Sequence, residues 1–169
     1  MPSATLPSQM PDRPSELIAR FGLLPHPEGG WYHQAFRSPH DVAPEDGRGT
    51  RKALTAIYFL LRRGECSRWH RVRSDEIWTH LEGDPLHLYL SSDLSSVDTR
   101  SLGGTGSGGT PLHVVPAGIW QAAEPAGDYA LVACFVGPGF EFEDFTLIPD
   151  DPHAAAQLRQ RGGDWTRLA

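Results

Sequence analysis

Short hydrophobic runs separated by polar turn residues occupy most of the chain from residue 31 onward. Aromatic and β-branched residues are frequent within these runs, and Gly, Pro, Asp and Ser mark the breaks between them, which is typical of β-strands joined by turns. The pattern predicts strands at 31–38, 54–61, 67–72, 76–82, 86–91, 110–116, 129–136 and 142–148. About eight strands in one domain predict an all-β fold, either a sandwich or a closed barrel.

Three details of the pattern qualify this reading. Residues 38–52 are predicted to form an exposed loop. Residues 101–110 form a glycine-rich turn that lacks the Gly-Lys-Ser/Thr ending of a phosphate-binding loop. Phe140 and Phe142 alternate with glutamates, which predicts an edge strand with apolar side chains inside.

Helices are predicted at the two ends of the chain. The first lies between Ser15, as its N-cap, and Gly22, and the second covers 151–162. Residues 1–14 contain four prolines and few large apolar side chains, which predicts a flexible tail. Residues 15–169 are predicted to form a single domain.

Composition excludes several classes of protein. The two cysteines, Cys66 and Cys134, are too few for a disulfide framework, and no N-terminal stretch has the order of a secretory signal, so we expect a cytoplasmic protein with reduced thiols. The longest apolar runs are too short to span a bilayer, which predicts no membrane partner. The net charge of -6 argues against nucleic-acid binding.

Positive charge is unevenly distributed along the chain. Eight of the fifteen Lys and Arg residues lie between Arg48 and Arg73, and none lies between Ser101 and Leu158. Two interpretations remain open: a solvated arginine-rich surface, or a locally basic face that attracts a small anionic ligand.

Candidate chemistry is concentrated in residues 64–83, GECSRWHRVRSDEIWTHLEG. Strand alternation places Glu76, Trp78 and His80 on one face of a strand, and a turn after the preceding strand brings His70 close to Glu76. Inside an apolar barrel a carboxylate and an imidazole perturb each other's pKa values, which is how a general acid or base is prepared. The alternative is a buried hydrogen-bonded pair without catalytic function.

This stretch resembles the first motif of the cupin superfamily. Gly64, His70, Glu76 and Gly83 fall on the motif positions, whereas Val72 occupies the position of its second histidine. The resemblance implies a double-stranded β-helix, or jelly-roll barrel, with the short N-terminal and C-terminal helices added.

The second cupin motif is similar to PAGIWQ, in which Pro116 and Gly118 match but Gln121 replaces the histidine. Five ordered segments extend the likeness to the DUF985-type (Cupin_5) family of predicted sugar epimerases. They are HPEGGWYHQAFRS, TAIYFLL, SDEIWTHLEGDPLHLYL, PAGIWQAA and VGPGFEFEDF. The resemblance implies a small polar ligand in the barrel and a homodimer.

A metal centre built on these motifs would consist of His70, Glu76 and Gln121. Transition-metal sites favour three or more imidazole and carboxylate ligands, and a neutral amide is a weak one. His80 lies four residues beyond Glu76 on the strand, about 13 Å away, which is too far to complete the set. We therefore expect no cofactor, with a divalent metal as the weaker alternative.

The remaining candidates are expected to contact the ligand. Trp78 either packs in the core or stacks on a ring, and His80 shares its strand face. In the segment around Gly29 and Gly30, the candidates are Glu28, Tyr32 and Arg37, against a plain turn and strand. Trp69 and Trp120 alternate with His70 and Gln121 and are expected to point away from the pocket.

The resemblance to predicted sugar epimerases, together with these residues, implies a metal-independent sugar or nucleotide-sugar epimerase or isomerase. His70 is the candidate base, Glu76 orients it or tunes its pKa, and Gln121 binds the substrate carbonyl or hydroxyl. The acid on the opposite face remains open among Tyr32, Tyr58, Tyr89 and His80. The alternatives are a metal-dependent oxygenase or isomerase and a non-enzymatic metabolite-binding protein.

Overall fold

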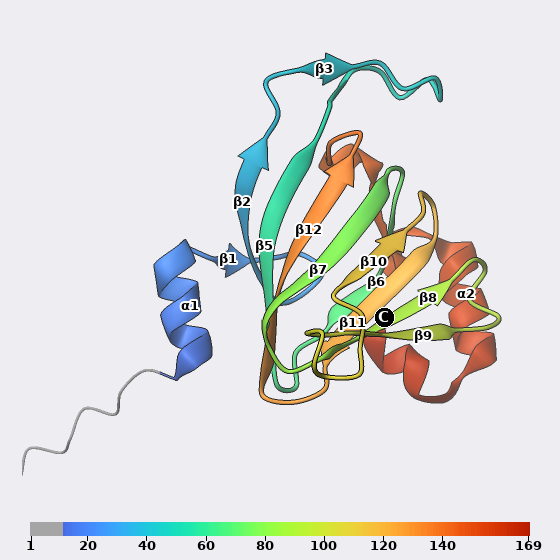
Figure 1. Ribbon diagram of the computed structural model, residues 1–169. Helices are drawn as coiled ribbons and strands as arrows, with labels where there is room; N and C mark the ends of the chain where they lie inside the picture. The colour runs from blue at the N-terminus through green and yellow to red at the C-terminus, as the bar shows by residue number, and fades with distance from the viewer. Residues whose placement is uncertain (1–11) are drawn as a thin grey trace, which may run out of the picture.

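The computed structural model describes residues 12–169, which form two β-sheets that face each other and carry helices on their outer sides (Figure 1). In spatial order the six-stranded sheet contains β1 (Leu24–Pro25), β2 (Trp31–Arg37), β5 (Thr55–Arg62), β12 (Tyr129–Gly137), β7 (Asp75–Gly83) and β10 (Leu112–Val115). The five-stranded sheet contains β13 (Phe145–Leu147), β6 (Ser67–Val72), β11 (Trp120–Pro125), β8 (Leu86–Ser91) and β9 (Asp98–Leu102). Every strand pair within these sheets is antiparallel, which confirms the all-β prediction.

A separate arm connects β2 and β5. It contains the short strands β3 (Asp41–Val42) and β4 (Arg51–Lys52), which pair with each other and project beyond the ends of the barrel strands (Figure 1). The arm occupies the segment predicted as an exposed loop.

The strand pattern predicted most strands of the two sheets but missed the two-residue β1 and the longer β9 and β11. Neither β9 nor β11 has the β-branched and aromatic enrichment of the other strands, and both are extended because they pair with β8. The predicted edge strand at Phe140 and Phe142 was wrong: a 3-10 turn, η1 (Phe142–Asp144), occupies this place. Its cause is tertiary, since the Asp144 side chain is buried in ion pairs with two arginines.

The helices lie at the predicted ends of the chain. α1 (Arg13–Phe21) ends at Gly22 as expected, but its N-cap is Asp12, whose side chain accepts a hydrogen bond from the Ser15 N–H. Ser15 is therefore inside the helix, and the part of the predicted tail from residue 12 onward is structured. Residues 1–11 lie outside the described part of the chain.

The C-terminal prediction is confirmed, because α2 (Pro152–Arg161) is capped by Asp151 and ends at Gly162. Two 3-10 segments flank this helix: η2 (Ile148–Asp150) precedes it, and η3 (Gly163–Leu168) follows it. Within residues 12–169 no helix has the length and apolar character needed to cross a membrane.

Strand alternation divides the hydrophobic residues among three layers. The first lies between the sheets, the second between the five-stranded sheet and the C-terminal helices, and the third beneath α1. Representative members of the three layers are Phe59, Leu61, Leu88 and Val132; Trp69, Trp120, Ile148 and Leu158; and Leu17, Leu60 and Leu131. Trp69 and Trp120 thus point away from the barrel interior, as predicted.

The inward side chains change character along the barrel. Leu61 and Val132 belong to an apolar core at one end, whereas Thr55, Glu76 and Val136 line an open space toward the end at which β12 terminates. The strand register therefore places the polar inward residues together at one mouth of the barrel, near the root of the arm (Figure 1).

Candidate functional site

A cavity of about 190 Å³ opens at this mouth. Half of its lining is aromatic or aliphatic, and the other half consists of polar or titratable side chains and a thiol. The first group is Ile57, Phe59, Val72, Trp78, Val136, Phe140, Phe142 and Phe145. The second is His26, Glu28, Tyr32, Gln34, Thr55, His70, Glu76 and Cys134.

A glycine turn brings Glu28 into the cavity. Gly29 has φ +108°, and a Cβ on it would lie 2.2 Å from the Cys66 carbonyl oxygen, so a larger residue does not fit there. The Ser67 hydroxyl donates to Glu28 Oε1 at 2.8 Å, which fixes the carboxyl group. The local sequence thus delivers Glu28 to the start of β6.

Glu28 lies between two imidazoles. Its Oε2 is 3.4 Å from His70 Nε2 and 3.5 Å from His26 Nδ1. His70 Nδ1 is 2.7 Å from the Arg68 carbonyl oxygen, which can only accept, so the Nδ1 carries a proton and Nε2 of the neutral ring is free. His26 Nδ1 accepts from the Glu28 backbone N–H at 3.2 Å. Glu28 Oε2 therefore faces two nitrogens that lack a proton when both rings are neutral.

Burial sets the protonation of these groups. It raises the pKa of Glu28 to about 8 and, with help from His70, lowers the pKa of His26 to about 4. Burial also lowers the pKa of His70. At neutral pH a protonated Glu28 can therefore offer its proton to His70 Nε2, which agrees with the hydrogen-bond directions.

Glu76 has a different partner. Gln121 Nε2 donates to Glu76 Oε2 at 2.5 Å, while Gln121 Oε1 accepts from Trp78 Nε1 at 3.0 Å. Burial raises the pKa of Glu76 to about 7, partly offset by the charge interaction with His70. The carboxyl group in direct contact with His70 is thus that of Glu28, which orients the ring together with the Arg68 carbonyl oxygen, whereas Glu76 acts on His70 through its charge, which raises the pKa of His70 against the effect of burial.

The donor set does not fit the metal that cupin motifs imply. Val72 offers no ligand, and both polar atoms of the Gln121 amide are engaged within the protein. Among residues 12–169 no group of three or more His, Cys, Asp and Glu side chains is arranged to hold a metal ion.

The structure separates the other predicted site residues. Tyr32 and Trp78 line the cavity, whereas Gln121 lies behind it as the support of Glu76. His80 pairs with Val132 at the filled end of the barrel, and its Nε2 lies 3.0 Å from the Asp84 carbonyl oxygen, so it does not face the cavity.

Tyr58 and Tyr89, two of the candidates for the acid on the opposite face of the ligand, do not line the cavity. Tyr58 packs with α1 in the layer outside the sheet, and Tyr89 lies on the outer face of the five-stranded sheet with its hydroxyl donating to Glu124. Arg37 pairs with Glu141 and is not among the lining residues.

Four polar lining residues were not predicted from the sequence: His26, Gln34, Thr55 and Cys134. His26 precedes Glu28 by two positions in the same quoted segment, but no strand was predicted there and no periodicity pointed to it. Cys134 was recognised as a reduced thiol but not as part of a site. Cys134 on β12 lies opposite Trp78 on β7, so the alternation of side chains along β12 places its thiol on the same inward face as Trp78.

An aromatic wall closes one side of the cavity. Its rings, Phe140, Phe142 and Phe145, lie 5.2 to 6.3 Å apart in edge-to-face arrangements. Phe145 lies 5.3 Å from the His70 ring, and Phe142 lies 6.2 Å from the His26 ring, measured between centroids. The wall therefore borders the titratable groups directly.

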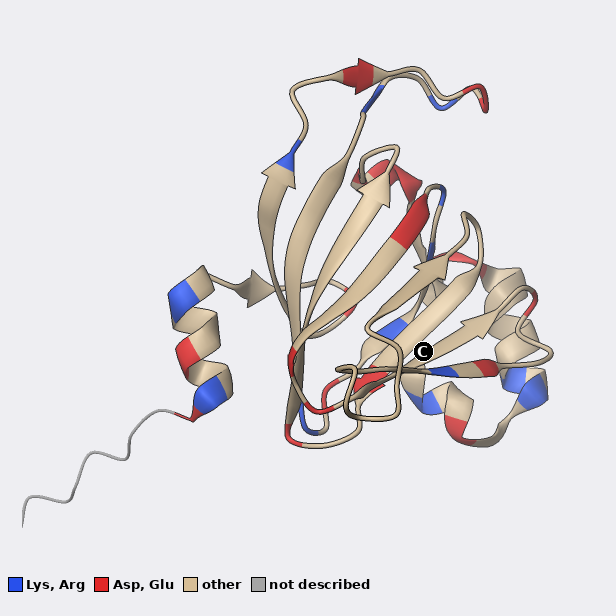
Figure 2. Cartoon of the chain, viewed as in Figure 1, with Lys and Arg blue, Asp and Glu red and all other residues tan. Residues whose placement is uncertain are grey.

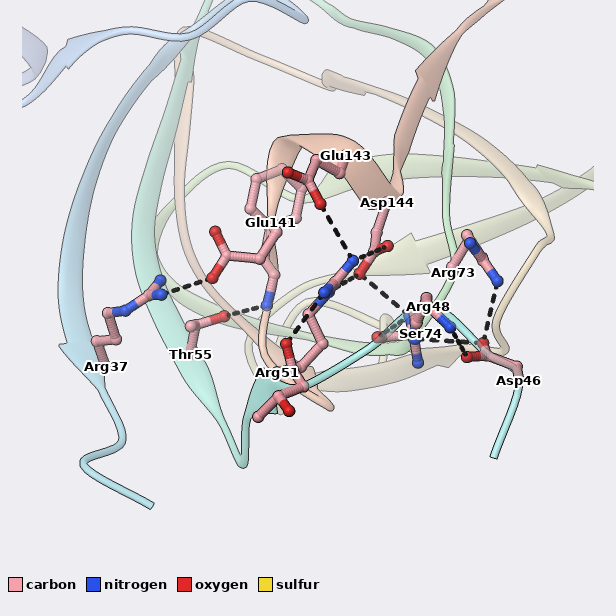
Figure 3. A network of polar contacts seen from close by, with 12 residues as sticks. Arg37, Asp46, Arg48, Arg51, Thr55, Arg73, Ser74, Glu141, Glu143 and Asp144 are labelled. Atoms are coloured by element: carbon pink, nitrogen blue, oxygen red, sulfur yellow. Dashed lines mark hydrogen bonds and ion pairs between the residues drawn. The ribbon is translucent and has the colours of Figure 1, made fainter. Parts of the chain in front are cut away.

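The arm holds this wall in place (Figure 3). Asp144, between Phe142 and Phe145, accepts from Arg51 Nε at 2.7 Å and Nη2 at 3.0 Å, and from Arg48 at 3.3 Å. At the other end of the segment the Phe140 N–H donates to Thr55 Oγ1 at 2.9 Å. We call residues 139–145 with these contacts the clamped segment.

The arginine-rich region does not form an unpaired basic face. Figure 2 shows charged residues mainly at strand ends, in connecting segments and on helices. The arginines of this region are largely paired, as in Arg48 and Arg51 with Asp144, Arg63 with Asp128, Arg71 with Asp151 and Arg73 with Asp46. Of the two interpretations of the charge pattern, the structure favours a surface of ion pairs.

Comparisons with known proteins agree with this architecture. The family model described as Cupin superfamily (DUF985) matches residues 15–148. The uncharacterized protein YML079W of Saccharomyces cerevisiae is 28% identical over 184 residues, covering 93% of this chain and 91% of the yeast protein. A hypothetical protein from Leishmania major has a TM-score of 0.73 and 32% identity, covering 86% of this chain and 96% of that one. Protein SO0799 from Shewanella oneidensis has a TM-score of 0.70 and 32% identity, covering 88% and 96%.

Proposed function

Because the chain belongs to the family described as Cupin superfamily (DUF985), we propose that it uses its barrel cavity as a metal-independent isomerase or epimerase. The reaction moves a proton on a carbon next to a carbonyl group of a small ligand. The family match confirms the cupin resemblance and its jelly-roll barrel, while the epimerase activity is our proposal.

One observation carries the proposal: Glu28 Oε2 lies 3.4 Å from His70 Nε2 inside a cavity. Proton transfer to and from carbon needs a base and an acid whose pKa values lie near the working pH. In the proposed reaction Glu28 first releases its proton to solvent, His70 Nε2 then takes the substrate proton, and the ionised Glu28 Oε2 accepts a hydrogen bond from the resulting imidazolium.

Glu76 provides the second titratable group. It projects from β7 of the six-stranded sheet, whereas His70 projects from β6 of the facing sheet. With a pKa of about 7 it exists in both protonation states at neutral pH. In the proposal Glu76 takes the acid role in preference to Tyr32, the one predicted acid candidate that lines the cavity, and Gln121 holds the Glu76 carboxyl group in position.

Hydrogen exchange in deuterated water tests this function without knowledge of the natural substrate. We would incubate the protein with dihydroxyacetone, D-glyceraldehyde, D-xylose and D-glucose and follow the C–H signal beside each carbonyl by proton NMR. Exchange with at least one compound is expected, and His70→Ala and Glu28→Gln are each expected to slow it about 100-fold or more.

The matched control is His113→Ala, because His113 lies on β10 outside the cavity lining. It should exchange hydrogen at the wild-type rate. Exchange no faster than in protein-free buffer, or exchange that survives His70→Ala, would favour a non-enzymatic metabolite-binding protein.

A further inference from the structure

We infer that the cavity takes an uncharged ligand about the size of one ring, with an apolar or planar face, and does not take a sugar nucleotide or another anion. The inference names the substrate class of the proposed isomerase and therefore rests on the proposed function. Three features carry it: the volume of the cavity, the charge of its lining and the aromatic wall.

The volume limits the ligand to a small molecule. The cavity measures about 190 Å³. An apolar cavity of about 150 Å³ accepts benzene, whereas drug-sized ligands occupy pockets of roughly 300 to 1,000 Å³. One ring with a few substituents fits this space, and a nucleotide joined to a sugar is much larger.

The lining gives an anion no Lys or Arg side chain as a partner. Among the cavity-lining residues of the described chain none is Lys or Arg, and the sequence of residues 1–11 contains neither. Two carboxyl groups, those of Glu28 and Glu76, border the same space. A buried phosphate or carboxylate would lose its hydration without gaining a charge-assisted hydrogen bond from a cation.

Two arginines that bind the clamped segment, Arg37 and Arg51, are already paired. Arg51 is committed to Asp144 through two hydrogen bonds, and Arg37 binds Glu141 (Figure 3). Recruiting Arg51 to a ligand would leave Asp144, which is 2% exposed, without a partner. The guanidinium group of Arg51 is therefore bound to Asp144 and is not available to a ligand in the cavity.

The aromatic wall selects a flat or apolar ligand face. Phe142 is 54% exposed and also lines the cavity, so part of its ring is available at the mouth. Because the clamped segment fixes the wall before a ligand arrives, stacking on these rings requires little additional ordering. Phe145 lies beside His70, so a ligand stacked on the wall presents its polar group to the proton-transfer residues.

Benzamide and benzoate match in size and separate the effect of charge from that of shape, and the larger uridine diphosphate glucose tests the size limit. We would measure the binding of benzamide, benzoate and uridine diphosphate glucose at pH 7 by protein-observed NMR, assigning shifts to cavity residues. Benzamide is expected to bind with a millimolar dissociation constant, typical of about nine heavy atoms, and benzoate at least about 10-fold more weakly. Uridine diphosphate glucose is expected not to shift the cavity signals.

Two phenylalanine variants test the wall. Phe142→Ala should weaken benzamide binding about 5-fold. The matched control is Phe36→Ala, because Phe36 is 48% exposed on β2 but is absent from the cavity lining. Benzamide affinity should not change in this control. Equal losses in both variants would overturn the role of the wall.

The outcomes distinguish this inference from the proposed function. Benzoate or the sugar nucleotide binding as tightly as benzamide would overturn the inference even if hydrogen exchange is observed. Failure of benzamide to shift cavity signals at about 10 mM would also overturn it. Benzamide binding without hydrogen exchange on any carbonyl compound would refute the isomerase while leaving the ligand class intact.

Discussion

Glu28 Oε2 lies 3.4 Å from His70 Nε2, although Glu28 lies in the turn between β1 and β2 of the six-stranded sheet and His70 lies on β6 of the five-stranded sheet. Glu28 is delivered by the turn before β2, and His70 by β6. Their contact creates a buried carboxyl and imidazole pair that shares protons at neutral pH.

The raised pKa of Glu28 makes protein stability depend on pH. Folding raises this pKa from its ordinary value of 4.5 to about 8, so the folded state holds a proton that the unfolded state releases. The stabilisation is fully present below pH 4.5 and is lost as the pH rises toward 8. We compare the decrease in the free energy of unfolding between pH 6.5 and pH 8 in the two proteins. This decrease should be smaller in Glu28→Gln than in the wild type by at least about 1 kcal/mol.

Urea denaturation at closely spaced pH values measures this difference. Unfolded His26, with its ordinary pKa of 6.5, and Glu76, with a pKa of about 7, also titrate in this window, but they are present in both proteins, so the prediction concerns only the difference between the two curves. Glu45→Gln, at an exposed position of the arm, should retain the wild-type pH dependence. A Glu28→Gln curve parallel to the wild-type curve would contradict the protonated state of Glu28.

The supporting role of Gln121 gives a second prediction. Gln121→Leu leaves Trp78 Nε1 and the Glu76 carboxyl without their buried partner, which should cost about 1 to 3 kcal/mol of stability. The same change removes a hydrogen bond that lowers the pKa of Glu76, so this pKa should rise above about 7 in a carbon-13 NMR titration. Gln160→Leu, exposed on α2, should change neither quantity. A Glu76 pKa unchanged in Gln121→Leu would remove Gln121 from the site.

The clamp predicts a strong dependence on Asp144. Asp144→Asn leaves Arg48 and Arg51, both largely buried, without their shared carboxylate, and should lower the free energy of unfolding by about 3 kcal/mol. The control is Asp128→Asn, because the pair of Asp128 with Arg63 is exposed and should contribute less than about 1 kcal/mol. Similar losses in the two variants, measured by urea denaturation, would argue against a buried clamp.

The donor set predicts low metal affinity. After incubation with manganese, iron(II), nickel or zinc and dialysis, the wild type should retain less than about one-tenth of an equivalent by mass spectrometry. A Val72→His, Gln121→His double variant, which restores the two cupin histidines, should retain more. One equivalent held by the wild type and lost in His70→Ala would overturn the metal-free mechanism.

The local sequence pattern correctly predicted the direction of a side chain where that direction follows from strand alternation. Trp69 and Trp120 point outward while His70 points inward, because successive side chains on a strand alternate between its faces. The same rule put Trp78 beside Glu76. The rule also placed His80 on the face of Glu76 and Trp78, but His80 does not line the cavity. Alternation gives the face of a strand on which a side chain lies and does not tell which end of the barrel is filled.

The sequence by itself determined the cupin barrel, the inward His70 and Glu76, and the departures at Val72 and Gln121 that argue against a metal. These depend on short-range periodicity and motif spacing. The tertiary structure alone decided that Glu28 and His26 meet His70, that Gln121 supports Glu76, and that the arm fixes the aromatic wall through Asp144. Such contacts join residues far apart in the chain, and the burial that shifts their pKa values exists only after the two sheets have packed together.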